Sequence, residues 1–251
     1  MACIRDGRGR PAFSTLCFRE DTDCGGVFRR KRIFWLGALS VVALLVAGGL
    51  FASNMGFKLN YPLASTGTAS GTNVLALPFN QQTNLSVARD LIDDIDAGAG
   101  SNVVVSVSQW LRNADGLDTY TTTGVGTDFA LTPGDAYYVV VNADTNYIVV
   151  GSHAPSLGVT FDAAGVNGSA SGTNFYALPY HTTASVARDL IDEVDLAAGS
   201  SVVVSVSAWL EGSDGLDTYT TTGVGTDFTL VPGEGYFVVV NSSVTFTPSH
   251  Y

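Results

Sequence analysis

The chain has 251 residues and a formal net charge of −11, which is divided unevenly along its length. Eight of the twelve basic residues lie in residues 1–32, whereas the part from Ser53 onward has four basic and nineteen acidic residues. This acidic part repels nucleic acid and anionic lipid, so no nucleic-acid partner is expected, and the cysteines, which all precede residue 33, leave it without disulfides.

The N-terminal segment predicts export. A basic cluster, Arg29–Arg32, precedes an uncharged apolar run at 33–52, as in a secretory signal peptide. Small residues near the end of the run predict cleavage after Gly49 or Ala52, so that the mature chain starts between Leu50 and Met55, and therefore a secreted protein of the extracellular cell surface. Because the run is also long enough to span a membrane, an uncleaved anchor is the alternative, and the leader would then be the only membrane contact. Residues 1–26 either belong to a long leader or precede a translation start at Val27.

The rest of the chain is a tandem duplication. Residues 70–142 recur at 171–241, and the segment 115–129 returns unchanged at 214–228. Each copy is large enough to bury its own core. A doubled small domain favours a scaffold, adhesion or assembly role over a single catalytic centre. The predicted organisation has three parts: a leader (1–52), repeat domain 1 (53–155) and repeat domain 2 (156–251).

The first expected element after the leader is a β-strand at 56–63. Its larger apolar residues alternate with polar or small ones, which gives the strand one apolar face; they are Phe57, Leu59, Tyr61 and Leu63. Residues 158–162 take the same place in the second copy. Such a strand pairs either within its own domain or with the sheet of a neighbouring subunit, and the second arrangement builds fibres. The sequence leaves both arrangements open.

A short strand at 73–78 and then a helix follow. Ser86 is the expected N-cap of the helix, and Gly98 and Gly100 are expected to end it. The apolar positions recur at helical spacing and predict one buried stripe: Val87, Ala88, Leu91, Ile92 and Ile95.

The clearest strand is 102–111, in which strict alternation assigns Val103, Val105 and Val107 to one face and Trp110 to the other.

Turns connect the remaining strands. A turn at 113–118 leads to a strand at 119–123, and Pro133–Gly134 turns the chain into a strand at 136–142. The same elements recur in the second copy. The sequence therefore predicts an α+β fold that is mostly β, with two tandem homologous domains, each an antiparallel sheet or sandwich with one short helix.

The order of these residues resembles a tandem module of bacterial secreted and cell-surface proteins. Its pattern is N-L-x-x-L-P, a short helix, a strand ending in Trp, a Tyr or Trp after the turn, and L-x-P-G-x-G-Y-(F/W)-V. The first copy matches it at Asn73, Leu77, Pro78, Trp110, Tyr120, Leu131, Pro133, Gly134 and Tyr137, with Ala136 in place of a glycine. The second copy matches it at Asn174, Leu178, Pro179, Trp209, Tyr219, Leu230, Pro232, Gly233, Gly235 and Tyr236. The resemblance covers most of both copies and implies a cell-surface location, without catalytic residues.

The turn after the Trp strand carries oxygen ligands two to three residues apart around a glycine, as in a calcium loop. The candidate ligands are Asn113, Asp115, Asp118, Asp214 and Asp217. Asp-Gly is also the commonest hairpin turn, so turn formation alone explains the same residues. Calcium is the only cofactor that the sequence suggests.

An aromatic pair flanks the same turn in each copy, Trp110 with Tyr120 and Trp209 with Tyr219. An exposed pair beside serine residues is suited to stacking on a sugar ring. The alternative is a cross-strand pair that packs under the helix.

The sequence predicts no enzyme. It has no G-x-S-x-G, G-x-G-x-x-G or Walker motif, and its three histidines are dispersed. We expect an exported structural protein of the bacterial cell surface that assembles with copies of itself into a filament or layer. A surface module that binds carbohydrate or calcium is the alternative.

Overall fold

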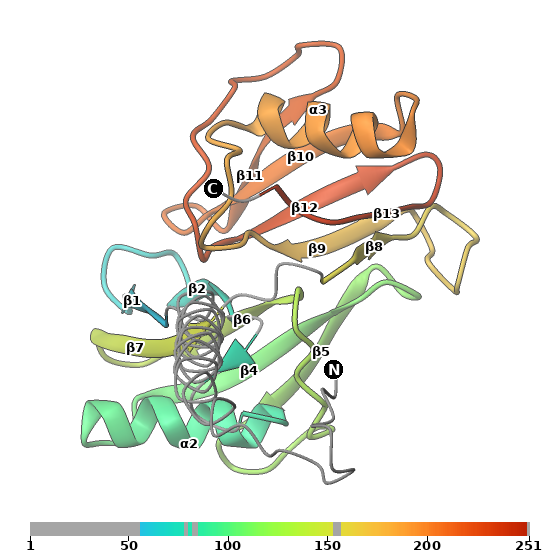
Figure 1. Ribbon diagram of the computed structural model, residues 1–251. Helices are drawn as coiled ribbons and strands as arrows, with labels where there is room; N and C mark the ends of the chain where they lie inside the picture. Colours follow the sequence, from blue (N-terminus) through green and yellow to red (C-terminus); the bar gives the residue numbers. More distant parts are fainter. Residues whose placement is uncertain (1–55, 78–79, 82–84, 153–156, 250–251) are drawn as a thin grey trace, which may run out of the picture. The chain divides into compact units, whose positions relative to one another are not determined.

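The computed structural model describes residues 56–77, 80–81, 85–152 and 157–249. The leader, with its predicted cleavage and anchor, and Pro78 of the module pattern lie outside these residues. Within the described ranges, no helix has the length and apolar character needed to cross a membrane. The described residues all belong to one compact unit (Figure 1).

The first repeat consists of one helix and two antiparallel sheets. One sheet has the strand order β2-β6-β4-β5, and the other has the order β1-β7-β3. The elements in chain order are β1 (Phe57–Leu63), β2 (Thr72–Ala76), β3 (Asn80–Gln81), α2 (Ala88–Ala99), β4 (Val104–Leu111), β5 (Gly116–Thr121), β6 (Ala136–Val141) and β7 (Thr145–Ser152).

The second repeat has the same plan with a shorter second sheet. Its strand orders are β11-β10-β12-β9 and β13-β8. The elements are β8 (Val159–Phe161), β9 (Thr173–Ala177), α3 (Ala187–Ala198), β10 (Val203–Leu210), β11 (Gly215–Thr220), β12 (Gly235–Val240) and β13 (Val244–Phe246).

The predicted fold class is confirmed, because the structure is mostly β and each repeat has antiparallel sheets with one helix. The strand register is also the same in both copies. Trp110 pairs with Leu117 as Trp209 pairs with Leu216. The linker strand β8 pairs with β13 as β1 pairs with β7, so residues 158–162 do replace the first strand in the second copy.

The helices begin one residue later than the predicted serine cap. In α2 the N-cap residue is Val87, with an extended backbone. The first two helical N–H groups are capped from another segment, since Ala88 N donates to Phe129 O (2.9 Å) and Arg89 N donates to Asp128 Oδ1 (2.9 Å). The Asp90 carboxylate accepts from the backbone N–H groups of Ser86 (2.9 Å) and Val87 (3.1 Å) and from the Ser86 hydroxyl (2.7 Å). Asp189 has the same role in α3. The prediction was wrong because it gave the serine the acceptor role, whereas the Ser86 hydroxyl donates to Asp90 and the carboxylate of Asp128 accepts from the helical N–H of Arg89.

The rest of the helix largely follows the sequence pattern. Gly100 ends α2 in the left-handed conformation, with φ of 70°, whereas Gly98 lies inside the helix. The predicted stripe is buried except at Val87, which is half-buried in the cap. Its buried members are Ala88, Leu91, Ile92 and Ile95.

A β-bulge makes the predicted face of Val105 wrong, whereas Val103 and Val107 share the core face and Trp110 lies on the other, as predicted. The pairing of β4 with β6 shifts register between Val104 and Ser106. Val104 therefore joins Val103 and Val107 in the core, while Val105 points outward with 40% of its surface exposed. Strand β10 has the same shift at the equivalent position. Strict alternation fails here because a bulge inserts one residue into the strand and reverses the side-chain order beyond it.

The helix of each repeat packs on its four-stranded sheet (Figure 1). The core of the first repeat lies beneath α2 and includes Tyr61 and Leu63 from β1. Side chains of both four-stranded sheets join in a third apolar cluster, which includes Ala136 and Phe237. The two repeats therefore meet through the sheet faces that their helices leave uncovered.

Candidate functional site between the repeats

Aromatic side chains occupy the centre of the contact between the repeats. Tyr138 of the first repeat stacks on Phe175 of the second, with ring centroids 5.0 Å apart. Trp209 meets Tyr138 edge-on at 5.1 Å, and Trp110 meets Phe237 in the same geometry at 5.1 Å. Stacked and edge-to-face pairs of this kind stabilise a contact beyond the area that they bury. The two repeats are therefore joined by a packed aromatic core.

Main-chain hydrogen bonds cross this contact in matched pairs. The bonds run from Ala76 N to Gly233 O (3.1 Å), Ala177 N to Gly134 O (2.9 Å), Ala69 N to Glu211 O (3.0 Å) and Ala170 N to Arg112 O (2.7 Å). Each bond in one direction has its equivalent in the other direction, so the repeats are related by an approximate two-fold axis. The main chains at the ends of β2 and β9 are bonded to the turns of the opposite repeat, which helps to protect these edge strands.

A groove of about 530 Å³ lies on the contact and is lined by both copies. Trp110 and Trp209 contribute aromatic surface, and the half-exposed side chains of Leu117 and Leu216 lie beside them. Serine and threonine residues and one aspartate also line the groove: Ser70, Thr72, Ser108, Thr173, Ser207 and Asp214. Aromatic surface beside hydroxyl groups suits a ligand that has both apolar faces and polar edges.

The four ligand-stacking candidates divide between the two faces of the sheets. Tyr120 pairs with Val107 on the face under α2, where it is buried in the core, while Trp110 lies on the opposite face. Tyr219 likewise packs against the core of the second repeat. The expected Trp–Tyr pair is therefore not formed, because the cross-strand partner of Trp110 is Leu117, and Tyr120 lies three positions beyond Leu117 on the opposite face of β5. The structure instead brings Trp110 and Trp209 to one groove.

Three of the five calcium candidates, Asp115, Asp118 and Asp214, accept hydrogen bonds from other side chains. Strand β5 begins at Gly116, earlier than predicted, so Asp118 lies in the strand and accepts a hydrogen bond from Gln109 Nε2 at 3.2 Å. Asp115, with a left-handed φ of 47°, accepts a hydrogen bond from the Ser171 hydroxyl of the other repeat at 2.8 Å.

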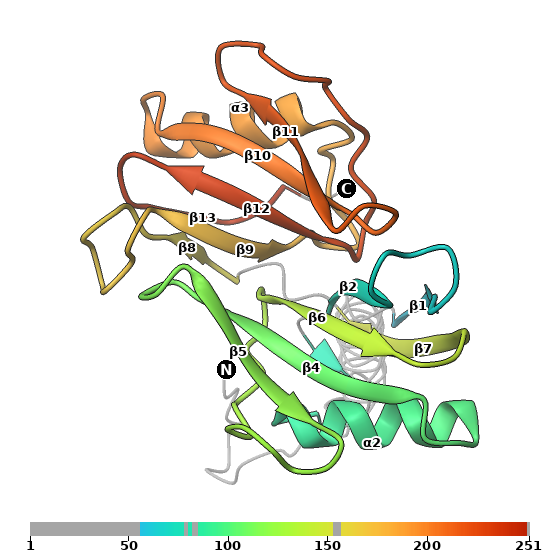
Figure 2. The same cartoon turned by 180° about the vertical axis from the view of Figure 1, so that it is seen from behind.

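The second copy mirrors this arrangement. Asp214 has φ of 48° and accepts a hydrogen bond from Ser70 at 3.0 Å, so each hairpin tip contacts the opposite repeat (Figure 2). Asn113 is exposed in the turn, and Asp217 lies in β11. Across the described ranges, no group of three or more His, Cys, Asp or Glu side chains is placed to hold a metal ion. The turn aspartates are therefore acceptors in the contact between the repeats.

The candidate assembly strand lies at the edge of a sheet, as predicted, and pairs with β7 of its own repeat. Phe57, Tyr61 and Leu63 are buried, and Leu59 is partly buried. The strand also reaches the second repeat, since Phe57 stacks on Tyr180 with centroids 4.4 Å apart.

The Tyr61 hydroxyl makes a second contact between β1 and the other repeat. It lies 2.5 Å from the carbonyl oxygen of Ala76 and 2.9 Å from that of Gly233. Burial, and the charge of Glu234 to a smaller extent, raise the pKa of Tyr61 well above its ordinary value. The hydroxyl therefore stays protonated and acts as a donor to carbonyl oxygens of both repeats.

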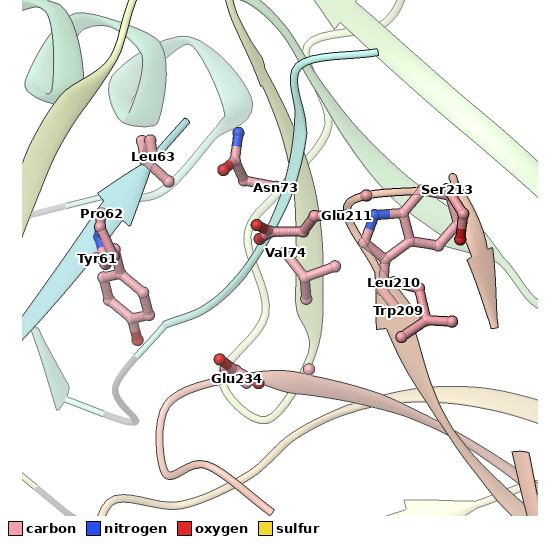
Figure 3. Close-up of a pocket in the computed structure, with 12 residues that line it drawn as sticks. Tyr61, Pro62, Leu63, Asn73, Val74, Trp209, Leu210, Glu211, Ser213 and Glu234 are labelled. Carbon is pink, nitrogen blue, oxygen red and sulfur yellow. The ribbon is translucent and has the colours of Figure 1, made fainter. Parts of the chain in front are cut away.

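A second hollow of about 530 Å³ lies beside β1 (Figure 3). Tyr61 and Leu63 line one side and Trp209 the other, and the Glu211 side chain extends between them. Glu234 lines the same hollow. The sequence does not predict this site, because neither glutamate belongs to a recognisable motif. The available signal was a difference between the copies, since Glu211 replaces Arg112 in an otherwise near-identical segment.

Comparisons with protein-family models, with curated proteins and with solved structures found no match.

Proposed function

We propose that this chain is an exported structural protein of the bacterial cell surface that assembles with copies of itself into a filament or layer. The observation that carries the proposal is the contact between the repeats. The aromatic core and the crossing main-chain bonds join two copies of one module into a single building block. The basic and apolar leader and the acidic repeats support export.

Strand β1 is the proposed assembly element. It is the first described strand, it lies at a sheet edge, and its buried side chains fill slots in the core of the first repeat. The same slots would accept the same strand from a neighbouring subunit, because exchange of an identical element preserves every contact. Chains linked in this way, each giving its β1 to the next, form a filament.

A reversible lock on β1 tests this proposal. Asn60 and Ile148 are paired neighbours on β1 and β7, and both side chains are exposed. The variant that combines Asn60→Cys with Ile148→Cys closes a disulfide after oxidation and holds β1 in its own subunit. The part of the chain beyond the leader has no other cysteine.

Electron microscopy of the exported protein gives the readout. We expect ordered polymers from the natural chain and from the reduced variant, and monomers from the oxidised variant. Polymers from the oxidised variant as well would reject strand exchange and leave self-assembly through another surface. Monodisperse monomers of the natural chain at all concentrations would contradict the structural role.

Carbohydrate binding is the second candidate, and the shared tryptophan groove favours it. Binding to a glycan array should be lost in Trp110→Ala and in Trp209→Ala. Leu196→Ala, which changes a helix residue that is 82% exposed, is the control. Equal glycan binding by all variants would exclude the groove. Calcium binding also stays a proposal, and a calcium-dependent rise in Tm that is lost in Asp115→Asn would support it.

A further inference from the structure

The approximate two-fold axis relates the hollow of Figure 3, which Glu211 and Glu234 line, to a site at Arg112 and Asp135 on the other side of the contact. We call the hollow at Glu211 the open side, and the site that the Arg112 side chain occupies the filled side. Arg112 and Glu211 occupy equivalent positions, because the carbonyl of each accepts the matching bond from Ala170 or Ala69. Their side chains therefore begin at the same place and differ in charge. The open side can therefore be compared with the filled side residue by residue.

On the filled side, the Arg112 guanidinium bridges two carboxylates. Its Nη1 lies 3.2 Å from Asp162, and its Nη2 lies 3.3 Å from Asp135. The remaining hollow is only about 20 Å³. A guanidinium group presents several donors in a fixed plane, which suits it to bind two oxygen partners at once.

On the open side, Glu234 stands at the position of Asp135, and Glu211 stands at the position of Arg112. Among the described residues, neither Glu211 nor Glu234 has a basic side chain within ion-pair distance. The Glu234 carboxylate accepts a hydrogen bond from the Tyr236 hydroxyl at 3.2 Å. Partial burial raises the pKa of both glutamates, and the charge of Glu211 adds to the rise at Glu234. The pair is thus an uncompensated acidic site.

The open side is also larger, because small residues replace large ones there. Val74 stands where the filled side has Phe175, and Gly235 stands where it has Ala136. The hollow of about 530 Å³ falls within the range of small-ligand sites. Its size therefore leaves room for a cation together with the rest of a small ligand.

The tryptophan of the open side lacks the hydrogen bond of its equivalent. Trp110 Nε1 donates to the carbonyl of Thr173 at 3.3 Å, whereas the buried Nε1 of Trp209 has no hydrogen-bond partner in the described part of the chain. A buried donor without an acceptor costs free energy, and a guanidinium has donors only, so a carbonyl or other acceptor elsewhere on the ligand would satisfy this N–H. The indole ring beside the two glutamates also offers a face for a planar cation.

We propose that this hollow binds the guanidinium group of an arginine-like ligand between Glu211 and Glu234, beside Trp209. The guanidinium takes the part that Arg112 plays in the other half of the contact. This site is independent of self-assembly, so its failure would leave the proposed structural role untouched.

Calorimetric titration of the exported protein with argininamide tests the site. Citrullinamide, which has nearly the same shape and no charge, is the matched probe. We expect saturable binding of argininamide and none of citrullinamide. Glu211→Gln and Glu234→Gln should each weaken binding by roughly tenfold or more, because each removes a charged partner. Asp93→Asn, which removes one negative charge from an exposed helix position, should bind as the natural chain does.

Glu211→Arg is the second variant, because it copies the filled side. It should abolish argininamide binding while the protein remains folded, as judged by circular dichroism. An arginine-containing tripeptide, Ala-Arg-Ala, distinguishes the source of the group. Binding of the tripeptide alone would support the site with a protein-borne arginine as its ligand. Equal binding of argininamide and citrullinamide, no binding of either argininamide or the tripeptide, or unchanged binding in both glutamine variants would overturn the proposal.

Discussion

Ala136 and Gly235 occupy equivalent positions in the two repeats and face each other where only one side chain fits. A Cβ atom built on Gly235 would lie 2.3 Å from the Cβ atom of Ala136, and 2.8 Å from Cγ1 of Val74. The alanine of the first copy is therefore accommodated by the glycine of the second copy.

Gly235→Ala should destabilise the protein by about 1–3 kcal/mol, because it overpacks the contact between the repeats. The backbone of Gly235 is not left-handed, so the effect is steric alone. Adding Ala136→Gly should restore most of the loss, although Val74 still crowds the new side chain. Urea unfolding of the natural chain, both single variants and the double variant gives the coupling free energy. Strictly additive effects would mean that the two residues do not meet.

Removal of β1 side chains should destabilise the first repeat. Leu63 is 2% exposed, so Leu63→Ala should cost about 2–5 kcal/mol in free energy of unfolding. Tyr61→Phe removes the hydroxyl that reaches both repeats and should cost about 1 kcal/mol. Lys58→Ala, at an exposed position of the same strand, is the control. Denaturant midpoints that are the same for all three variants would contradict the packing of β1 in the core.

The hairpin tips should contribute equally to the contact. Asp115→Ala and Asp214→Ala each remove one hydrogen bond to a serine of the opposite repeat, so each should lower the free energy of unfolding by roughly 0.5–1.5 kcal/mol. Ser171→Ala should add little in the Asp115→Ala background, since the bond is already lost. Full additivity of those two changes, measured by urea unfolding, would show that the bond is not formed.

The acidic pair should make stability depend on pH. Both glutamates have a raised pKa in the folded protein, so their charged forms are disfavoured by folding. The penalty is present in full above the folded pKa and disappears as pH falls to the ordinary glutamate value. Glu211→Gln should therefore raise Tm by a few degrees near neutral pH and by less with increasing acidity. A gain in Tm that stays constant down to about pH 4 would contradict this cause.

The sequence predicts the repeats, the helix stripe and the edge strand, because these depend on periodicity and on local contrast between apolar and polar residues. It does not predict that Val105 is exposed, because the consecutive valines do not indicate where the extra residue of the bulge lies. It places Trp110 beside Tyr120 because both flank one turn, although the alternation of side chains along the strands puts them on opposite faces of the sheet. The partners of Asp115 lie in the other repeat, and no spacing within one copy indicates them.

Comparison of the two copies helps to locate the acidic hollow. Arg112 and Glu211 stand out in the alignment, but their neighbours Asp162 and Glu234 come from distant segments. Only the fold brings these side chains to equivalent sites. A charge reversal between two near-identical copies therefore indicates a candidate site. The residues that form the site become visible only when the contact between the repeats is known.

Differential scanning calorimetry of the exported chain tests the central claim that the two repeats form one block. The account predicts a single transition whose van't Hoff enthalpy equals the calorimetric enthalpy, at roughly 0.7 kcal/mol for each residue of both repeats. Leu63→Ala, which changes only the core of the first repeat, should shift this whole transition to lower temperature. Two separate transitions, of which Leu63→Ala shifts only one, would contradict the account.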